Sequence, residues 1–302
     1  MPTFGRAYEG RKTRESLAAA LIALEKSPMS KFMLDVSINY AYMHFGAPKL
    51  SSSVLEAQGL IELRTRCIGK RMLWPDSGHM EYIRRLSDVE HHVDMYFITE
   101  SGKAELRQLL KSIKDHELVS SMAKELSQVV KEEGISELRM RFDAQINTYM
   151  LNYTLKVLAA LEMYEQLTFT RLIVMDAAGL RKLFLDMRDP WTYYTRLGQL
   201  KKLIEYGVVE FVDSQYYVLL RPARPYSEME RTKEDDREHL SETEFSIDSA
   251  DGLFQLSDSG KVLLERIENG SFDVNAKKLL TNIKNRMLRR TTSSLFGEDS
   301  DK

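Results

Sequence analysis

The sequence predicts a mainly α-helical protein with small β-hairpins, an α+β architecture in which one helix-rich unit occurs twice. Apolar residues recur at helical spacing over long stretches of the chain. A glycine followed by a short apolar run occurs once in each half, at 55–66 and 203–214. A Ser-Gly-Lys segment then follows in each half, in "YFITESGKAELRQLL" and "LFQLSDSGKVLLERI". Because both signals recur in the same order, we expect two similar domains.

Length and composition are those of a two-domain chain. The 302 residues include a single cysteine, Cys67, so no disulfide can form within the chain and a cytoplasmic location is expected. No apolar run approaches the roughly 20 residues that span a bilayer, so no membrane partner is expected. The net charge is −2, but the segment 228–244 alone holds eight acids and three bases. The basic residues outside it are clustered, which can produce an electrostatic footprint.

The first unit is predicted from its helical patterns and its glycine. Helices are expected at 13–26, 30–45 and 48–58. Gly59 then suits the left-handed residue that ends a helix, and a strand begins after it. Thr99 suits the N-cap of a closing helix, with Glu100 in its first turn. That helix is expected to run over 103–132, with a break at Gly134.

The second unit follows the same order. Helices are expected at 144–167, 177–186 and 190–206, the last of which begins with proline, a residue suited to a first turn. Gly207 matches Gly59, and Ser257 matches Thr99 as an N-cap. A closing segment at 274–290 is amphipathic and carries six bases and no acids, and the tail after it is expected to be disordered.

The Ser-Gly-Lys segments do not fit a phosphate-binding loop. Such a loop needs a glycine five residues before its Gly-Lys pair and a Ser or Thr after the lysine. Phe97 and Gln255 occupy the glycine positions, and Ala104 and Val262 follow the lysines. The segments are therefore interpreted as architecture.

The order of helices, glycine, strand, second strand, cap and helix resembles a winged-helix domain. "LEAQGLIEL" followed by "YFITESGKAEL" is similar to the PadR and MarR groups of regulators in particular. The resemblance covers about 50 residues in each copy and implies two winged-helix domains joined by long helices. We expect winged-helix domain 1 at 1–113, a helical connector at 114–143 and winged-helix domain 2 at 144–270. The acidic insertion 228–244 lengthens the second wing, and 271–302 holds the basic helix and tail.

The resemblance implies that the third helix of each unit enters the major groove of DNA. In the second unit, Arg and Gln side chains suit base edges, and Thr and Lys suit phosphates. The residues expected there are Thr192, Thr195, Arg196, Gln199 and Lys202. The alternative is a solvated helix face with no ligand.

The first unit offers phosphate contacts and a basic wing. Those expected to contact DNA are Lys49, Ser51 and Ser52 near the third helix and Arg64, Arg66, Lys70 and Arg71 in the wing. An exposed basic hairpin with no DNA contact is an equal alternative.

These features predict a non-enzymatic DNA-binding protein, either a transcriptional regulator or a replication-initiator-type factor. The chain shows no dinucleotide loop, nucleophile elbow or zinc spacing, so no cofactor, metal or catalytic residue is expected. Double-stranded DNA is the expected partner, with nucleoid association. The alternative is a protein-interaction subunit, such as a tandem winged-helix subunit that binds the kleisin of an SMC-type complex. The long helices would then serve a homodimer or a protein partner.

Overall fold

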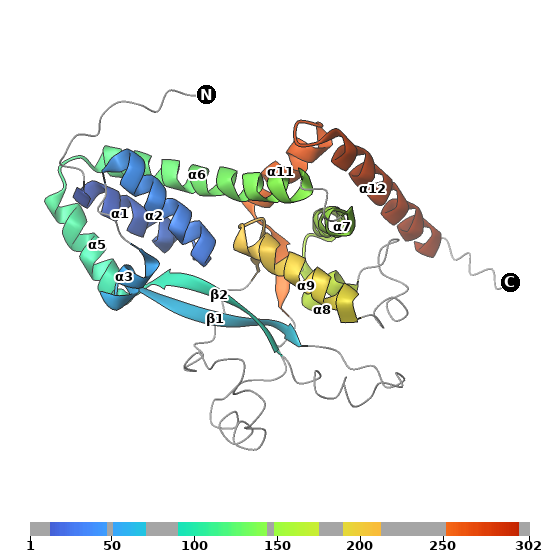
Figure 1. The fold of residues 1–302 in the computed structure, drawn as a ribbon, viewed down its shortest axis with the longest axis horizontal. Helices are drawn as coiled ribbons and strands as arrows, with labels where there is room; N and C mark the ends of the chain where they lie inside the picture. The colour runs from blue at the N-terminus through green and yellow to red at the C-terminus, as the bar shows by residue number, and fades with distance from the viewer. Residues whose placement is uncertain are drawn as a thin grey trace, which may run out of the picture.

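The computed structural model describes residues 13–46, 51–70, 90–143, 148–174, 190–212 and 252–295. Within these ranges the protein is mainly helical and carries two small antiparallel sheets (Figure 1). The sequence prediction of an α+β architecture is confirmed at this level. The helix expected at 177–186, the acidic segment 228–244 and the tail after 295 lie outside the described residues.

The first unit combines three helices with a β-hairpin and a closing helix. Its elements are α1 (Thr13–Lys26), α2 (Lys31–Phe45), α3 (Ser52–Ala57), β1 (Ile61–Lys70), β2 (Glu90–Ile98) and α5 (Glu100–Ser112). The strands pair antiparallel from Ile61↔Ile98 to Lys70↔Glu90, with a register shift between Cys67 and Gly69. Met29, between α1 and α2, forms an isolated antiparallel β-bridge with Tyr96 of β2 and so extends the hairpin by one pairing on that side.

The second unit repeats this order of elements. It contains α7 (Thr148–Tyr164), β3 (Leu167–Thr168), α8 (Phe169–Val174), α9 (Pro190–Glu205), β4 (Val209–Phe211), β5 (Leu253–Leu256) and α11 (Asp258–Glu268). Its strands form a sheet of order β3-β5-β4, in which β3 takes the place of the Met29 bridge. The closing helix α12 (Val274–Leu295) follows and packs on α7 and α11.

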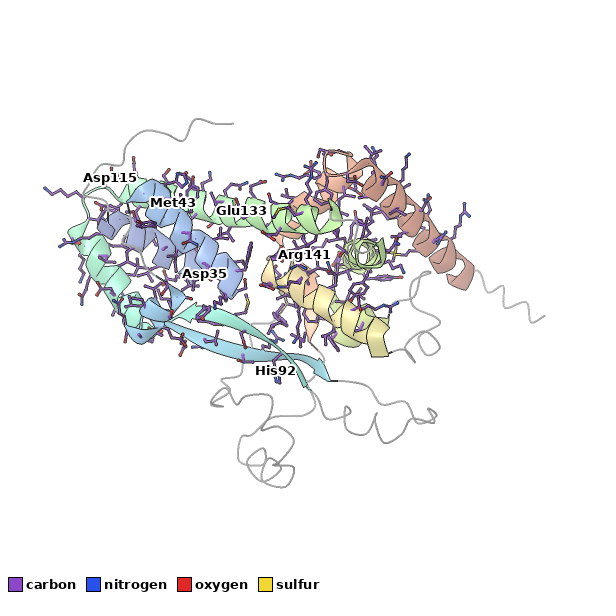
Figure 2. The ribbon with its side chains drawn as sticks, viewed as in Figure 1. Asp35, Met43, His92, Asp115, Glu133 and Arg141 are labelled. Carbon is purple, nitrogen blue, oxygen red and sulfur yellow. The ribbon has the colours of Figure 1, made fainter. Side chains whose placement is uncertain are left out.

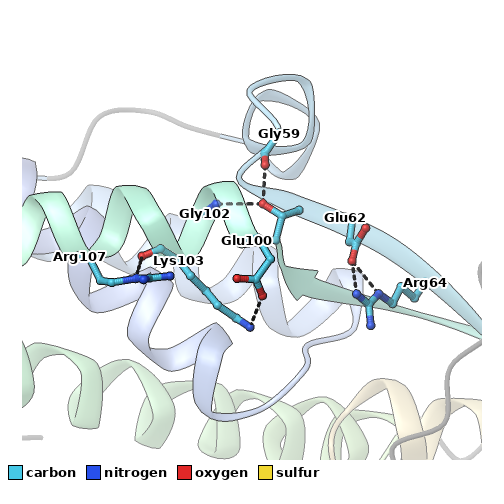
Figure 3. Close-up of polar contacts among 8 residues, drawn as sticks. Gly59, Glu62, Arg64, Glu100, Gly102, Lys103 and Arg107 are labelled. Atoms are coloured by element: carbon cyan, nitrogen blue, oxygen red, sulfur yellow. Dashed lines mark hydrogen bonds and ion pairs between the residues drawn. The ribbon is translucent and has the colours of Figure 1, made fainter.

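Both predicted caps are confirmed, and their main hydrogen bonds are the same in the two units. Figure 3 shows the cap of the first unit. The Thr99 hydroxyl accepts a hydrogen bond from Gly102 N at 2.9 Å and donates to the Gly59 carbonyl. Ser257 does the same with Gly260 N, at 3.0 Å, and with the Gly207 carbonyl. The repeated motif therefore joins the start of each closing helix to the end of each third helix.

Two glycines in each copy are explained by this junction. Gly59 and Gly207 have φ of 69° and 68°, the left-handed conformation expected at the end of a helix. At Gly102 and Gly260 a Cβ atom would lie only 2.1 and 2.2 Å from the carbonyl oxygens of the residues after those helix ends. The Ser-Gly-Lys glycine is thus a packing requirement.

The long helix α6 (His116–Asp143) belongs to both units. Its first half supplies Val119 and Leu126 to the core of the first unit, and its second half supplies Ile135 and Leu138 to the core of the second. Figure 1 shows this helix running along one side of both units. The interval 114–143 is therefore an integral part of both cores rather than a bare linker.

The predicted helix over 103–132 with a break at Gly134 is wrong in its boundaries. The chain leaves the helix between α5 and α6, and α6 continues through Gly134. A Cβ atom on Gly134 would lie 2.3 Å from the Tyr206 carbonyl oxygen. The glycine allows α6 to approach the second unit closely, which a single sequence does not distinguish from a helix break.

The two units contact one another directly as well as through α6. The Ser30 hydroxyl donates to the Glu205 carbonyl at 2.6 Å, and the Phe32 and Tyr206 rings meet edge-on at 4.9 Å. The far end of the β1–β2 hairpin reaches the second unit, where Ile68 is fully buried and its carbonyl accepts a hydrogen bond from Gly252 N. Arg141, which lies near the end of α6 and is labelled in Figure 2, donates to the Tyr206 hydroxyl at 2.8 Å. These contacts hold the hairpin and α9 in one assembly.

Candidate nucleic-acid interface

The two side chains predicted to contact bases from α9 are buried. Arg196 is 5% exposed and donates from Nη1 to the Ile173 carbonyl at 2.7 Å. Gln199 is 2% exposed and donates from Nε2 to the Thr154 hydroxyl at 2.8 Å. Both are polar groups satisfied inside the second unit. The prediction that Arg196 and Gln199 contact base edges is contradicted by this structure.

The error came from the width of the buried face of α9. In the sequence of α9, Leu197, Leu200 and Ile204 form an apparent apolar stripe, and Arg196 and Gln199 lie beside it. Leu203, four residues after Gln199 and seven after Arg196, is also fully buried. Because α9 packs against both α7 and α8, its buried face is wide enough to include the polar pair. The position of Leu203 was the available signal.

The other residues of α9 that were predicted to contact DNA, where their side chains are described, lie nearer the surface. Thr195 and Lys202 are half-buried, and Lys202 forms an ion pair with Glu205 one turn later. The side chain of Thr192 lies outside the described residues. Burial lowers the pKa of the Lys201 ammonium, and the Asp94 carboxylate of β2 opposes that shift. The charged side of α9 therefore faces, in part, the hairpin of the first unit.

The third helix of the first unit is short and presents little positive charge. Ser51 is the N-cap of α3: its hydroxyl accepts from Val54 N at 3.3 Å and shares a hydrogen bond with Ser53. Ser52 is 5% exposed, so the prediction that it contacts a phosphate is contradicted. Lys49 lies outside the described residues.

The arginines of the hairpin are engaged within the protein. Arg64 donates from Nε to Glu62 at 2.7 Å, as Figure 3 shows, and its guanidinium lies over the Phe97 ring. Arg66 is 4% exposed and its guanidinium lies 4.1 Å from the centre of the Phe211 ring, in the second unit. The predicted phosphate contact by Arg66 is therefore contradicted, because the side chain joins the two units.

The predictions for Lys70 and Arg71 remain untested. Lys70 is the last residue of β1, and its side chain is not among those described. Arg71 lies outside the described residues.

A basic surface is present instead on α12. One side of this helix is buried against the second unit through Ala276, Leu280, Ile283 and Met287. Among the described side chains, the opposite side of the helix is exposed and consists mainly of bases, amides and a hydroxyl, with Leu288 as an apolar member and Val274 exposed at the start of the helix. We call this surface the α12 polar face; its exposed residues include Lys277, Lys278, Thr281, Asn282, Asn285, Arg286 and Arg289. No acidic residue occurs within α12, so this face has no carboxylate of its own.

The lysine at the edge of this face is not available to a ligand. Lys284 is paired with both Glu162 of α7 and Glu268 of α11. Burial lowers the pKa of this ammonium, but the two hydrogen-bonded carboxylates outweigh burial and raise it. Lys284 therefore fixes α12 against the rest of the unit, and the exposed bases project from a helix that is held in place.

Neither a metal centre nor a membrane span is found among the residues that the structure describes. No group of three or more His, Cys, Asp or Glu side chains there is arranged to hold a metal ion. None of the helices in those ranges is both long and apolar enough to cross a bilayer.

No family model, curated protein or solved structure matches this chain.

Proposed function

We propose that the protein is a non-enzymatic, tandem winged-helix protein that binds double-stranded DNA through the α12 polar face. Both units share the order helix, strand or bridge, helix, helix, strand, strand, which supports the winged-helix assignment. The observation that carries the DNA proposal is the exposed row of bases on α12 with no acid in the helix.

The composition of this face suits a nucleic-acid backbone better than a protein surface of mixed charge. Lysine and arginine neutralise phosphates, and asparagine and threonine donate hydrogen bonds to phosphate oxygens. The α12 polar face runs from Lys277 to Arg289, which corresponds to about 20 Å at 1.5 Å per residue. That length is roughly half of one helical turn of DNA, so the face can contact several neighbouring phosphates. Binding of this kind is strongly dependent on salt and only weakly dependent on sequence.

The test is the salt dependence of duplex binding by a neutralised variant. Replacing Lys277, Lys278 and Arg286 with glutamine removes three exposed bases from the face. Each phosphate contact contributes about 0.9 to the slope of log K against log salt concentration. The slope of the triple variant is therefore expected to fall by about 2 to 3.

A matched control changes the same number of charges elsewhere. Lys111, Lys114 and Lys124 are exposed and lie on α5, α6 and the segment between them. Replacing these three with glutamine leaves the slope unchanged if α12 carries the contact. The absence of duplex binding at low salt, or an equal loss in both triple variants, would refute the proposal.

The second candidate function is a protein-interaction subunit, of the kind that binds a kleisin in an SMC-type complex. It is favoured by the burial of Arg196 and Gln199 and by two neighbouring exposed apolar side chains on α2. Tyr42 is 45% exposed and Met43 is 75% exposed. Figure 2 labels Met43 on α2. Recovery of a stoichiometric protein partner from nuclease-treated extract, lost on Met43→Glu, would favour this function over DNA binding.

A further inference from the structure

A cavity lies where the two units meet. Its walls come from the turn after α1, from α2 and β2 of the first unit, and from β4 and the start of α11 of the second. Helix α6, which belongs to both cores, closes one side. The volume is about 560 Å³, within the range of small-molecule sites in proteins.

Most of the wall is apolar and adaptable. Three methionines of the first unit line the cavity together with residues of the second unit. Methionine fills irregular apolar space because its side chain is unbranched and polarizable. The apolar lining includes Met29, Met33, Met95, Val130, Tyr206 and Phe211. A flexible aliphatic chain suits such a wall.

Two lysines give the cavity a cationic element. Lys26, at the end of α1, is exposed and has no ion-pair partner among the described residues. Lys131 of α6 lies 3.7 Å from Asp258, and both side chains are substantially exposed, so this pair is weak. Ser127, one turn before Lys131, adds a hydroxyl on the same face of α6.

Both acids that line the cavity already have a partner. Glu210 accepts a hydrogen bond from Gln255 at 2.9 Å. Asp258 lies 3.7 Å from Lys131 and 3.9 Å from Lys261, so a ligand carboxylate at Lys131 competes with an exposed, weak ion pair, whereas Lys26 has no such competitor among the described residues. An anionic group on a ligand is therefore better matched to Lys26 and Lys131 than a cationic group is to the acids.

We propose that this cavity binds a medium-chain aliphatic carboxylate. The hydrocarbon chain contacts the methionine-lined wall, and the carboxylate pairs with Lys26 and Lys131. This proposal is independent of DNA binding, because the α12 polar face does not contribute to the cavity.

A ligand in the cavity would contact both units at the place where they pack together. Met33 lies against Gly207, where a Cβ atom would come within 3.0 Å of the methionine methyl. The Ser30–Glu205 hydrogen bond is in the same joint. A ligand that contacts both units stabilises the arrangement to which it binds, so it also couples their relative positions.

The experiment measures binding of hexanoate and octanoate, with octanol as the uncharged analogue, by titration calorimetry on the full chain. Each buried methylene contributes about 0.8 kcal/mol, so octanoate should bind roughly tenfold or more tightly than hexanoate. Octanol should bind more weakly than octanoate, because it lacks the charge. No binding at millimolar concentrations, or equal affinity for octanoate and octanol, would overturn the proposal.

Two sets of variants localise the site. Lys26→Gln with Lys131→Gln should weaken octanoate about tenfold and leave octanol unchanged. Lys111→Gln with Lys114→Gln is the control and should change neither. Met33→Trp fills the cavity and should weaken both ligands. Unchanged octanoate affinity in the Lys26 and Lys131 variant would refute the site, even if Met33→Trp failed to fold.

Discussion

The two units have similar cap junctions but different third helices. Their cap junctions share the same backbone hydrogen bond: Thr99 N donates to the Leu60 carbonyl at 3.1 Å, and Ser257 N donates to the Val208 carbonyl at 3.2 Å. Their third helices differ, since α3 has 6 residues and α9 has 16. The shared junction fixes the backbone where the third helix, the hairpin and the closing helix meet.

This comparison shows which residues the fold requires, at the junction, and which can vary, on the outer face of the third helix. The junction uses backbone groups, a small hydroxyl and glycines, so it is compatible with many surrounding sequences. The third helix only has to end at the junction, and its outer face can change. In the second unit that face has become part of the core and of the joint with the first unit, which removed Arg196 and Gln199 from solvent.

The largest expected loss of stability comes from substituting the glycines of the junction. Gly102→Ala and Gly260→Ala each place a Cβ atom near 2 Å from a carbonyl oxygen, closer than any non-bonded contact. The backbone must move, so we expect each change to lower the free energy of unfolding by about 3 kcal/mol. Chemical denaturation measures this directly.

Gly198 is the matched control for these two changes. It is exposed in the middle of α9, and a Cβ atom there would have no neighbour within 4 Å. Gly198→Ala should raise the free energy of unfolding by up to about 1 kcal/mol, because alanine favours the helix. A loss below about 0.5 kcal/mol for Gly102→Ala would show that the junction is not rigid.

The next effect distinguishes a core role from a DNA-contacting role for α9. Arg196→Met removes the hydrogen bond to the Ile173 carbonyl and should cost about 2 kcal/mol of stability. Lys202→Met changes a half-exposed ion pair and should cost less than about 1 kcal/mol. Duplex binding by the folded Arg196→Met variant should match that of the parent. Unchanged stability with lost binding would restore the original prediction for α9.

Much of the fold could be predicted because its signals are local. Gly59 and Gly207 end helices through their own backbone freedom, and Thr99 and Ser257 cap helices through groups three residues away. The predicted helix at 274–290 corresponds to α12 for the same reason, since its apolar spacing is local.

The site residues were harder to predict because they depend on tertiary packing. Arg66 looks like a basic wing residue in sequence, but Phe211, which covers it, is far away in the chain. Gln199 is a polar residue on a helix, and only its position against Thr154 shows that it is buried. Glycine is a residue that disfavours helices, so Gly134 suggests a helix break in the sequence. Only the close approach of the Tyr206 carbonyl explains why a glycine is present within α6. Such contacts between distant segments leave no periodic signal in a single sequence.

A smaller effect compares the two caps. Ser257→Ala and Thr99→Ala each remove a hydroxyl that both accepts and donates, and we expect losses of about 1 to 2 kcal/mol. The Ser257 side chain is buried and that of Thr99 is partly exposed, so the loss at Ser257 should be the greater. Thr99→Ser retains the hydroxyl and serves as the control. A greater loss at Thr99 would mean that the two junctions are energetically different despite their shared geometry.

The smallest effect concerns how α6 is held by each unit. In the first unit the Tyr40 hydroxyl donates to Glu125 at 2.7 Å, and in the second the Arg266 guanidinium donates to both oxygens of Glu132 at 2.7 and 2.8 Å. The hydrogen bonds from Arg266 lower the pKa of the Glu132 carboxyl, against a smaller opposing effect of burial.

Because the Glu132 pKa is lower in the folded state, its stabilisation is complete above the ordinary value of 4.5 and disappears as pH falls through the lowered value. Glu132→Gln should therefore cost less than about 1 kcal/mol at pH 7, since the pair is partly exposed. The difference between this variant and the parent should vanish in acid. Glu125→Gln keeps an acceptor for the Tyr40 hydroxyl and should cost nothing measurable at pH 7. A pH-independent loss on Glu132→Gln would assign the contribution of Glu132 to packing, and the second half of α6 would then be held by its apolar contacts alone.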